Sequence, residues 1–159
     1  TFSEDDRNWF DQYVTKTYYK NLTPERIKYS FDINFHGSRV PDDAMFMYED
    51  RMAIFEDEAR YDQFLDYYLG CIEAMLNEPV MEDLHKITQP VLVIFGQDDL
   101  LIPNRILHAG LTTEDVLKTA VAVFKNSKAV MVEECGHFAI WDQPKKIAKE
   151  IRNFINQYY

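Results

Sequence analysis

The chain has 159 residues, of which 47% are hydrophobic and 28% charged, and this size and composition are typical of one globular, soluble domain with a sizeable core. Its formal net charge is -10, with 27 acidic and 17 basic residues, which argues against nucleic acid as a partner because phosphate binding needs clustered lysines and arginines. No apolar run approaches the ~18 residues of a transmembrane helix and no signal peptide opens the chain, so we expect no membrane partner.

Helical periodicity fills the first 80 residues. Ser3 followed by Asp6 resembles a capping box, and Thr23 followed by Pro24 is typical of a capped helix start. Apolar spacing predicts four helices: Ser3–Lys20, one from Thr23 that breaks at His36-Gly37-Ser38, one over about Pro41–Glu56 and one over about Asp57–Asn77. Their many aromatic and methionine side chains indicate core packing or, alternatively, the lining of a substrate pocket.

The second half changes to an alternation of strands and helices. The apolar run Val91–Phe95 predicts a strand buried on both faces, as in a parallel sheet covered by helices. A short helical turn over Pro103–Ala109, a helix from Thr112, a second strand over Ala129–Glu133 and a last helix from Pro144 follow. The order is therefore a helix-rich segment followed by β-α-β-α.

Both predicted strands run directly into residues that can carry chemistry. Asp98 and Asp99 follow the first strand, and His137 follows the second. Because ligands and catalytic groups gather at the carboxyl ends of parallel strands, we expect a carboxylate and a histidine to meet there. Gly136, just before the histidine, is expected to allow a tight backbone turn.

Two parallel strands are too few to form a stable sheet. A strand covered on both faces needs neighbours that complete its hydrogen bonds and bury its side chains. We expect the missing strands to come from an upstream part of the polypeptide, from a partner chain or from a swapped assembly. Exposed apolar sheet edges should also make the isolated chain self-associate.

At this point the motifs resemble the carboxyl-terminal third of the α/β-hydrolase fold. The resemblance rests on VLVIFGQDDLLIP from Val91 to Pro103, on AVMVEECGHFAIWDQP from Ala129 to Pro144 and on the terminal amphipathic helix. It implies that Asp99 is the catalytic acid, that His137 is the catalytic histidine and that residues 1–82 form the helical cap or lid inserted over the pocket. Residues 83–159 would then be the C-terminal part of an α/β core whose sheet is incomplete in this chain. The phrase CGHFAIW is most similar to the branch that holds carbon–carbon bond hydrolases and related esterases.

Several residues leave alternatives open. Asp98 is a rival to Asp99, although the Gly-x-x-Asp register favours Asp99, and the two aspartates could instead serve a turn or a helix cap. Phe138 and Trp141 are candidates for the mouth of a substrate pocket, and core packing is an equal alternative. His36, His85 and His108 are interpreted as surface or packing residues.

The two cysteines complete the candidate list. Cys71 and Cys135 form no disulfide framework and favour a reducing, cytoplasmic compartment. Cys135 is expected to be a buried small residue rather than a nucleophile or ligand. No Cys/His spacing typical of a metal site is present, and we expect neither a metal nor a cofactor.

The sequence lacks the nucleophile elbow that the resemblance requires. The fold carries its serine in Gly-x-Ser-x-Gly before the acid and the histidine, and Ser3, Ser30, Ser38 and Ser127 are all outside that pattern. The first interpretation is therefore the lid and C-terminal portion of a serine-type hydrolase that cleaves an ester, an amide or an activated C–C bond in a small-molecule substrate, and that is inactive without its upstream part. The alternatives are a non-catalytic, hydrolase-derived binding module and a self-contained helical binding domain.

Overall fold

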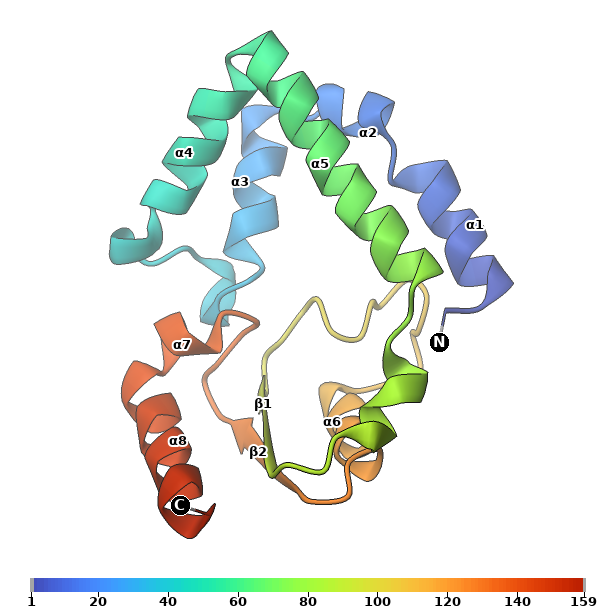
Figure 1. Cartoon of the computed structure of the whole chain (residues 1–159). Helices are drawn as coiled ribbons and strands as arrows, with labels where there is room; N and C mark the ends of the chain where they lie inside the picture. The colour runs from blue at the N-terminus through green and yellow to red at the C-terminus, as the bar shows by residue number, and fades with distance from the viewer. Residues whose placement is uncertain (1, 159) are drawn as a thin grey trace. The chain divides into compact units, whose positions relative to one another are not determined.

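The computed structural model describes residues 2–158 (Figure 1). The chain forms two compact units. Unit 1 comprises Thr1–Lys28 and Met45–Glu82, and unit 2 comprises Tyr29–Ala44 and Asp83–Tyr159. The predicted division at residues 82 and 83 therefore differs from the structure in one stretch, 29–44, which packs with the C-terminal unit. No helix among the described residues is both long and apolar enough to cross a bilayer.

Unit 1 is built from helices. They are α1 (Glu4–Tyr13), α2 (Lys16–Lys20), the first half of α3 (Pro24–Asp32), α4 (Phe46–Phe55) and α5 (Glu58–Asn77). The capping box predicted at Ser3 and Asp6 is present, and the Asp57 side chain caps α5 by accepting from the Arg60 N–H. The prediction of one helix over Ser3–Lys20 was wrong, because Thr15 adopts an extended conformation and caps α2 through its side chain.

The helix predicted from Pro41 also begins later. Residues Asp42–Ala44 form a short 3-10 turn, η2, and regular α-helix starts only at Phe46. α3 ends at Asp32, and a second 3-10 turn, η1 (His36–Ser38), follows it. Gly37 lies in the left-handed region at φ 71°, where glycine carries no Cβ penalty. These irregular turns form the stretch that belongs to unit 2.

Unit 2 contains a two-stranded parallel sheet. β1 (Val91–Gly96) pairs in register with β2 (Ser127–Val132), from Val91 opposite Ser127 to Gly96 opposite Val132. The 3-10 turn η3 (Met81–Lys86) precedes β1, and α6 (Thr113–Ala122), α7 (Ala139–Asp142) and α8 (Pro144–Tyr158) complete the unit. In the stretch predicted as a short helical turn, Pro103–Ala109, one turn is closed by a hydrogen bond from the His108 N–H to the Asn104 carbonyl at 2.8 Å. Both predicted strands are confirmed, with ends shifted by one or two residues.

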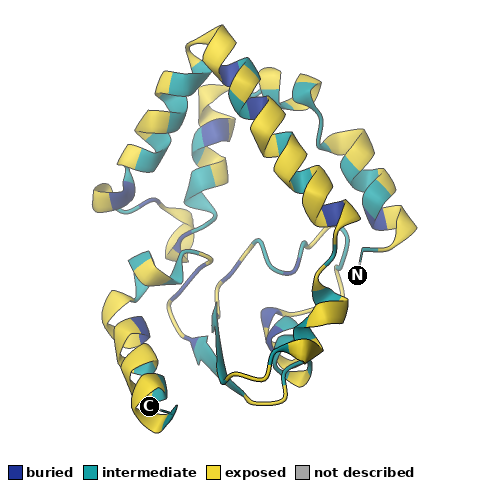
Figure 2. Ribbon diagram, in the orientation of Figure 1, coloured by how far each residue is buried: buried dark blue, intermediate teal, exposed yellow. Residues whose placement is uncertain are grey.

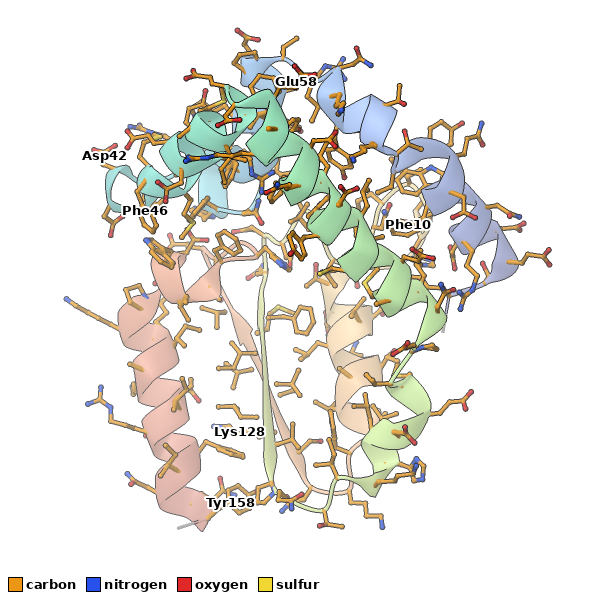
Figure 3. All side chains as sticks on the ribbon, turned by 45° about the horizontal axis from the view of Figure 1, so that its top comes forward. Phe10, Asp42, Phe46, Glu58, Lys128 and Tyr158 are labelled. Atoms are coloured by element: carbon orange, nitrogen blue, oxygen red, sulfur yellow. The ribbon has the colours of Figure 1, made fainter. Side chains whose placement is uncertain are left out.

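Helices cover the two faces of this sheet. α6 and α8 lie on opposite sides of the strands (Figure 1). On the α8 side, Val132, Cys135 and Ile147 form a buried cluster against which Ile94 and Val130 pack. At the far end of α8, Lys128 pairs with Glu150 at 3.0 Å and the Tyr158 hydroxyl donates to Asn126 Oδ1 at 3.0 Å, which holds that end to β2 (Figure 3).

The strands are not buried on both faces as predicted. Most of their residues are only partly buried, as Figure 2 shows by the intermediate colour along both strands. The physical reason is that a pair of strands has no neighbours to cover its outer edges. On α7 and α8, Ile140, Ile151 and Ile155 keep 63%, 41% and 48% of their surface exposed, so these two helices carry exposed apolar side chains.

Candidate active site

The acid at the site is Asp99, in the turn directly after β1. It is only 2% exposed. Its Oδ1 accepts hydrogen bonds from the backbone N–H groups of Leu101 and Ile102 at 2.8 and 3.0 Å, and its Oδ2 lies 2.9 Å from His137 Nδ1. The backbone of the turn therefore fixes one carboxylate oxygen and leaves the other for the histidine.

The histidine lies in the loop after β2, 38 residues further along the chain. The loop makes its sharp turn at Glu134, which has a positive φ of 55°, and the chain then passes through buried Cys135 and Gly136. The His137 side chain is 37% exposed while Asp99 beneath it is buried. The imidazole is bound to a buried carboxylate through Nδ1, and part of the ring is exposed to solvent. This is the arrangement of a general base.

The pair shifts the protonation equilibria of both partners. Burial tends to raise the pKa of Asp99, but hydrogen bonds from His137, Leu101 and Ile102 outweigh it and hold that pKa below its ordinary value. The hydrogen bond to Asp99 raises the pKa of His137 above its ordinary value, against the opposing effect of burial. Asp99 is therefore ionised at neutral pH. In its uncharged form, His137 must carry its proton on Nδ1, the nitrogen that contacts Asp99.

Replacing Asp99 with asparagine is expected to lower the pKa of His137. The amide removes the negative charge that favours the imidazolium, so protonation of His137 would require a lower pH. A histidine titration followed by NMR measures this directly. Asp115→Asn is the control, because the Asp115 side chain accepts from Thr112 in the capping box of α6 and not from His137. A His137 pKa that is unchanged in Asp99→Asn would contradict the pairing.

A second carboxylate–histidine pair lies beside the first. Asp98 Oδ2 is 2.8 Å from His36 Nδ1, and the two side chains are 44% and 47% exposed. The two neighbouring aspartates thus take different histidines, and the register Gly-x-x-Asp selects Asp99 for His137. His36, interpreted from the sequence only as a surface or packing residue, has a specific partner 62 residues away that no local motif indicates.

Glycine allows the two loops to touch. A Cβ on Gly96 would lie 2.1 Å from the carbonyl oxygen of Gly136 and 2.3 Å from that of Cys135. The Asp98 N–H donates to the Cys135 carbonyl at 2.8 Å, which ties the acid loop to the histidine loop. This contact brings the ends of β1 and β2 close enough for Asp99 to reach His137.

Phe138 and Trp141, the candidates for the mouth of a substrate pocket, have different surroundings. The Phe138 ring packs edge-on against Phe35, with centroids 5.3 Å apart, and lies 5.9 Å from the His137 ring. Phe138 and His137 both border an open groove of about 600 Å³ whose other walls are apolar residues of β1, α7 and α8. Trp141 is partly buried in α7 and is not among the residues that line this groove.

Cys135 is fully buried, as expected. Burial raises the pKa of its thiol to about 11, with the negative charges of Asp142, Asp98 and Asp99 adding to the effect. The thiol is therefore protonated at neutral pH and cannot act as a thiolate nucleophile. Among residues 2–158, no group of three or more His, Cys, Asp or Glu side chains is arranged to hold a metal ion.

Known proteins resemble the chain both in sequence and in structure. No family model matches the chain. A stretch of 82 residues, 50% of the chain, is 30% identical to a proline iminopeptidase of Saccharolobus solfataricus and covers 22% of that protein. The structure resembles the crystal structure of a membrane phospholipase A, described as a bacterial virulence factor, with a TM-score of 0.60 and 19% identity, over 86% of this chain and 39% of that one.

The chain thus spans about a fifth of the curated relative and about two fifths of the solved structure. The observed architecture, mostly helical with a two-stranded parallel sheet, is a partial α/β fold. Together with the sequence match to a peptidase and the structural likeness to a phospholipase, it supports a relationship between this chain and the α/β hydrolases.

Proposed function

We propose that this chain is the cap and C-terminal part of a serine-type α/β hydrolase, in which Asp99 and His137 are two members of a Ser-His-Asp triad. The observation that carries the proposal is the 2.9 Å contact between His137 Nδ1 and buried Asp99, placed after two adjacent parallel strands. The serine comes from a Gly-x-Ser-x-Gly segment outside these 159 residues, which contain none.

The chemistry follows from the tautomer of the histidine. With Nδ1–H donated to Asp99, Nε2 is the nitrogen that accepts the proton of the serine hydroxyl during attack on the substrate carbonyl. The ionised Asp99 then stabilises the imidazolium, which returns the proton to the leaving group. The oxyanion hole, like the serine, belongs to the upstream part of the protein.

The substrate class is an ester or an amide, with an activated C–C bond as a third candidate. The two comparison proteins are named for peptidase and phospholipase activities, and these act on an amide and an ester, respectively. In this proposal the helical segment 1–82 is the cap, and its residues 29–44 belong to the core unit. Phe138 contributes an apolar wall beside His137, and Trp141 of α7 is the second residue that we propose for substrate contact. An exposed free thiol at Cys71 favours a reducing, cytoplasmic compartment.

A non-catalytic, hydrolase-derived module that binds a partner is the second candidate. One observation favours it, namely the absence of the Gly-x-Ser-x-Gly pattern from the 159 residues. The two candidates differ in what they require: the first needs a serine-bearing segment in the same protein or complex, and the second does not.

The intact masses of all polypeptides that purify with the chain under denaturing conditions distinguish the candidates. The hydrolase proposal expects a longer parent or a second chain that contains Gly-x-Ser-x-Gly, and hydrolysis of a p-nitrophenyl ester by that assembly. The 18.8 kDa chain by itself is expected to give no turnover above buffer. Turnover by the isolated chain that disappears in His137→Ala would overturn the proposal.

The same sample tests the proposed partner. We infer that the upstream hydrolase segment, or otherwise a second copy of the chain, covers the open sheet edges and the exposed isoleucines of α7 and α8. Sedimentation of the isolated chain is expected to show species heavier than 18.8 kDa that become more abundant with concentration. A monomer at all concentrations with a sharp thermal transition would contradict this.

A further inference from the structure

The segment 34–36, which follows α3, is hydrogen-bonded to both loops of the acid–base pair. Asp142 Oδ2 accepts from the backbone N–H of His36 at 2.9 Å and from that of Gly136 at 2.7 Å. The Phe138 N–H donates to the Asn34 carbonyl at 2.9 Å. All these residues belong to unit 2, and none is assigned to the triad.

We propose that Asp142 is a positioning residue for His137, assisted by the His36–Asp98 pair, and that it acts by clamping segment 34–36 against the histidine loop. This inference rests on the proposed function, because it concerns how the same histidine is held in place on Asp99.

The hydrogen bonds bracket His137 on both sides. Gly136 immediately precedes the histidine and is bound by the Asp142 carboxylate, and Phe138 immediately follows it and is bound by the Asn34 carbonyl. The backbone of the histidine is thus fixed before and after its Cα, which restricts the direction of the imidazole. One carboxylate oxygen that accepts from two N–H groups 100 residues apart in the sequence, those of residues 36 and 136, joins the segment and the loop at one atom.

Close packing reinforces the clamp. A Cβ on Gly136 would lie 2.7 Å from the Asn34 carbonyl oxygen, 2.8 Å from the Phe35 carbonyl carbon and 3.0 Å from the His36 nitrogen. Gly136 has no positive φ, so the glycine serves this close approach rather than the tight turn expected from the sequence. The side chain of Phe35 is 1% exposed and its ring meets the Phe138 ring edge-on, so the segment is anchored in the core.

The His36–Asp98 pair links the same segment to the acid loop. Because both side chains are nearly half exposed, the pair contributes a geometric restraint rather than a large share of the stability. The Asp98 N–H is in turn bonded to the Cys135 carbonyl. The acid loop, the histidine loop and segment 34–36 therefore form one closed set of hydrogen bonds around the Asp99–His137 contact.

NMR of the histidine side chains in the full chain tests the inference, with Asp142→Ala and Asp142→Asn as the matched pair. Both variants remove the same negative charge, but asparagine keeps an oxygen that accepts from the two N–H groups. We expect Asp142→Ala to abolish the exchange-protected Nδ1–H signal of His137 and to lower its pKa. We expect Asp142→Asn to retain the signal. Asp115→Ala, which removes a helix cap of α6, controls for general destabilisation and should leave the signal in place.

Asp99→Asn distinguishes a failure of the positioning role of Asp142 from a failure of the Asp99–His137 pair itself. If Asp99→Asn shifts the His137 pKa and Asp142→Ala leaves both signal and pKa unchanged, the positioning role is wrong and the acid–base pair stands. If Asp99→Asn has no effect either, the pair itself is wrong. Should Asp142→Ala not fold, amide hydrogen exchange in the unsubstituted chain decides. The His36 and Gly136 N–H groups that Asp142 accepts from are expected to be protected, and rapid exchange at both overturns the inference.

Discussion

Gly96→Ala is expected to destabilise the C-terminal unit more than an alanine at any other glycine of the chain. The new Cβ would overlap the carbonyl oxygens of Gly136 and Cys135 at 2.1 and 2.3 Å. Both are backbone atoms and cannot rotate away, so the ends of β1 and β2 must separate. We expect a loss of about 3 kcal/mol in the free energy of unfolding, at the upper end of ordinary overpacking.

Chemical denaturation measures this loss, and two other glycines provide matched controls. Gly70 lies inside α5 and Gly110 in a turn, and an added Cβ at either position meets nothing within 4 Å. Gly70→Ala should be neutral or stabilising by up to about 1 kcal/mol, because alanine is the better helix former. Gly96→Ala with a stability equal to that of Gly110→Ala would show that the two loops do not touch as described.

The same substitution should also affect the site. The contact at Gly96 precedes Asp98 and Asp99 by two and three residues, so separating the loops moves Asp99 away from His137. In Gly96→Ala we therefore expect the His137 pKa to fall toward its ordinary value, since the hydrogen bond to Asp99 is the main cause of its raised pKa. The NMR titration used for Asp99→Asn detects this change.

Local patterns predicted the strands and the residues at their ends. An apolar run such as Val91–Phe95 closed by a glycine is read within one short window, and the Gly-x-x-Asp register singled out Asp99 over Asp98. The capping box at Ser3 depends on two residues three apart, so it could also be predicted from the local sequence. The break at Thr15 was missed because the aromatic spacing continues across it.

Long-range contacts could not be predicted in the same way. His36 and Asp98 are 62 residues apart, and His36 and Asp142 are 106 apart, with residues 45–82 of unit 1 between them in the chain. A turn motif such as His36-Gly37-Ser38 indicates only where a helix stops. Its partners depend on the return of residues 29–44 to unit 2, which no periodicity or composition indicates.

In the serine-containing hydrolase that we propose, His137→Ala is expected to lower kcat by about six decades, the size of the loss for a triad histidine. The substitution removes the base that accepts the serine proton and leaves only binding and the oxyanion hole. Asp99→Asn should lower kcat by about four decades, because the amide no longer selects the tautomer with Nε2 unprotonated. Asp98→Asn should cost far less, since an amide oxygen still accepts from His36.

The assay is steady-state ester hydrolysis, with His85→Ala as the control because His85 is an exposed residue of η3. A larger loss in Asp98→Asn than in Asp99→Asn would reassign the acid. The dependence of kcat/KM on pH adds a separate check, since His137 accepts a proton only when neutral. Because the hydrogen bond to Asp99 raises the pKa of His137, the rate should rise with pH through a midpoint above that of an ordinary histidine, and a midpoint below it would mean that the base is not held by Asp99.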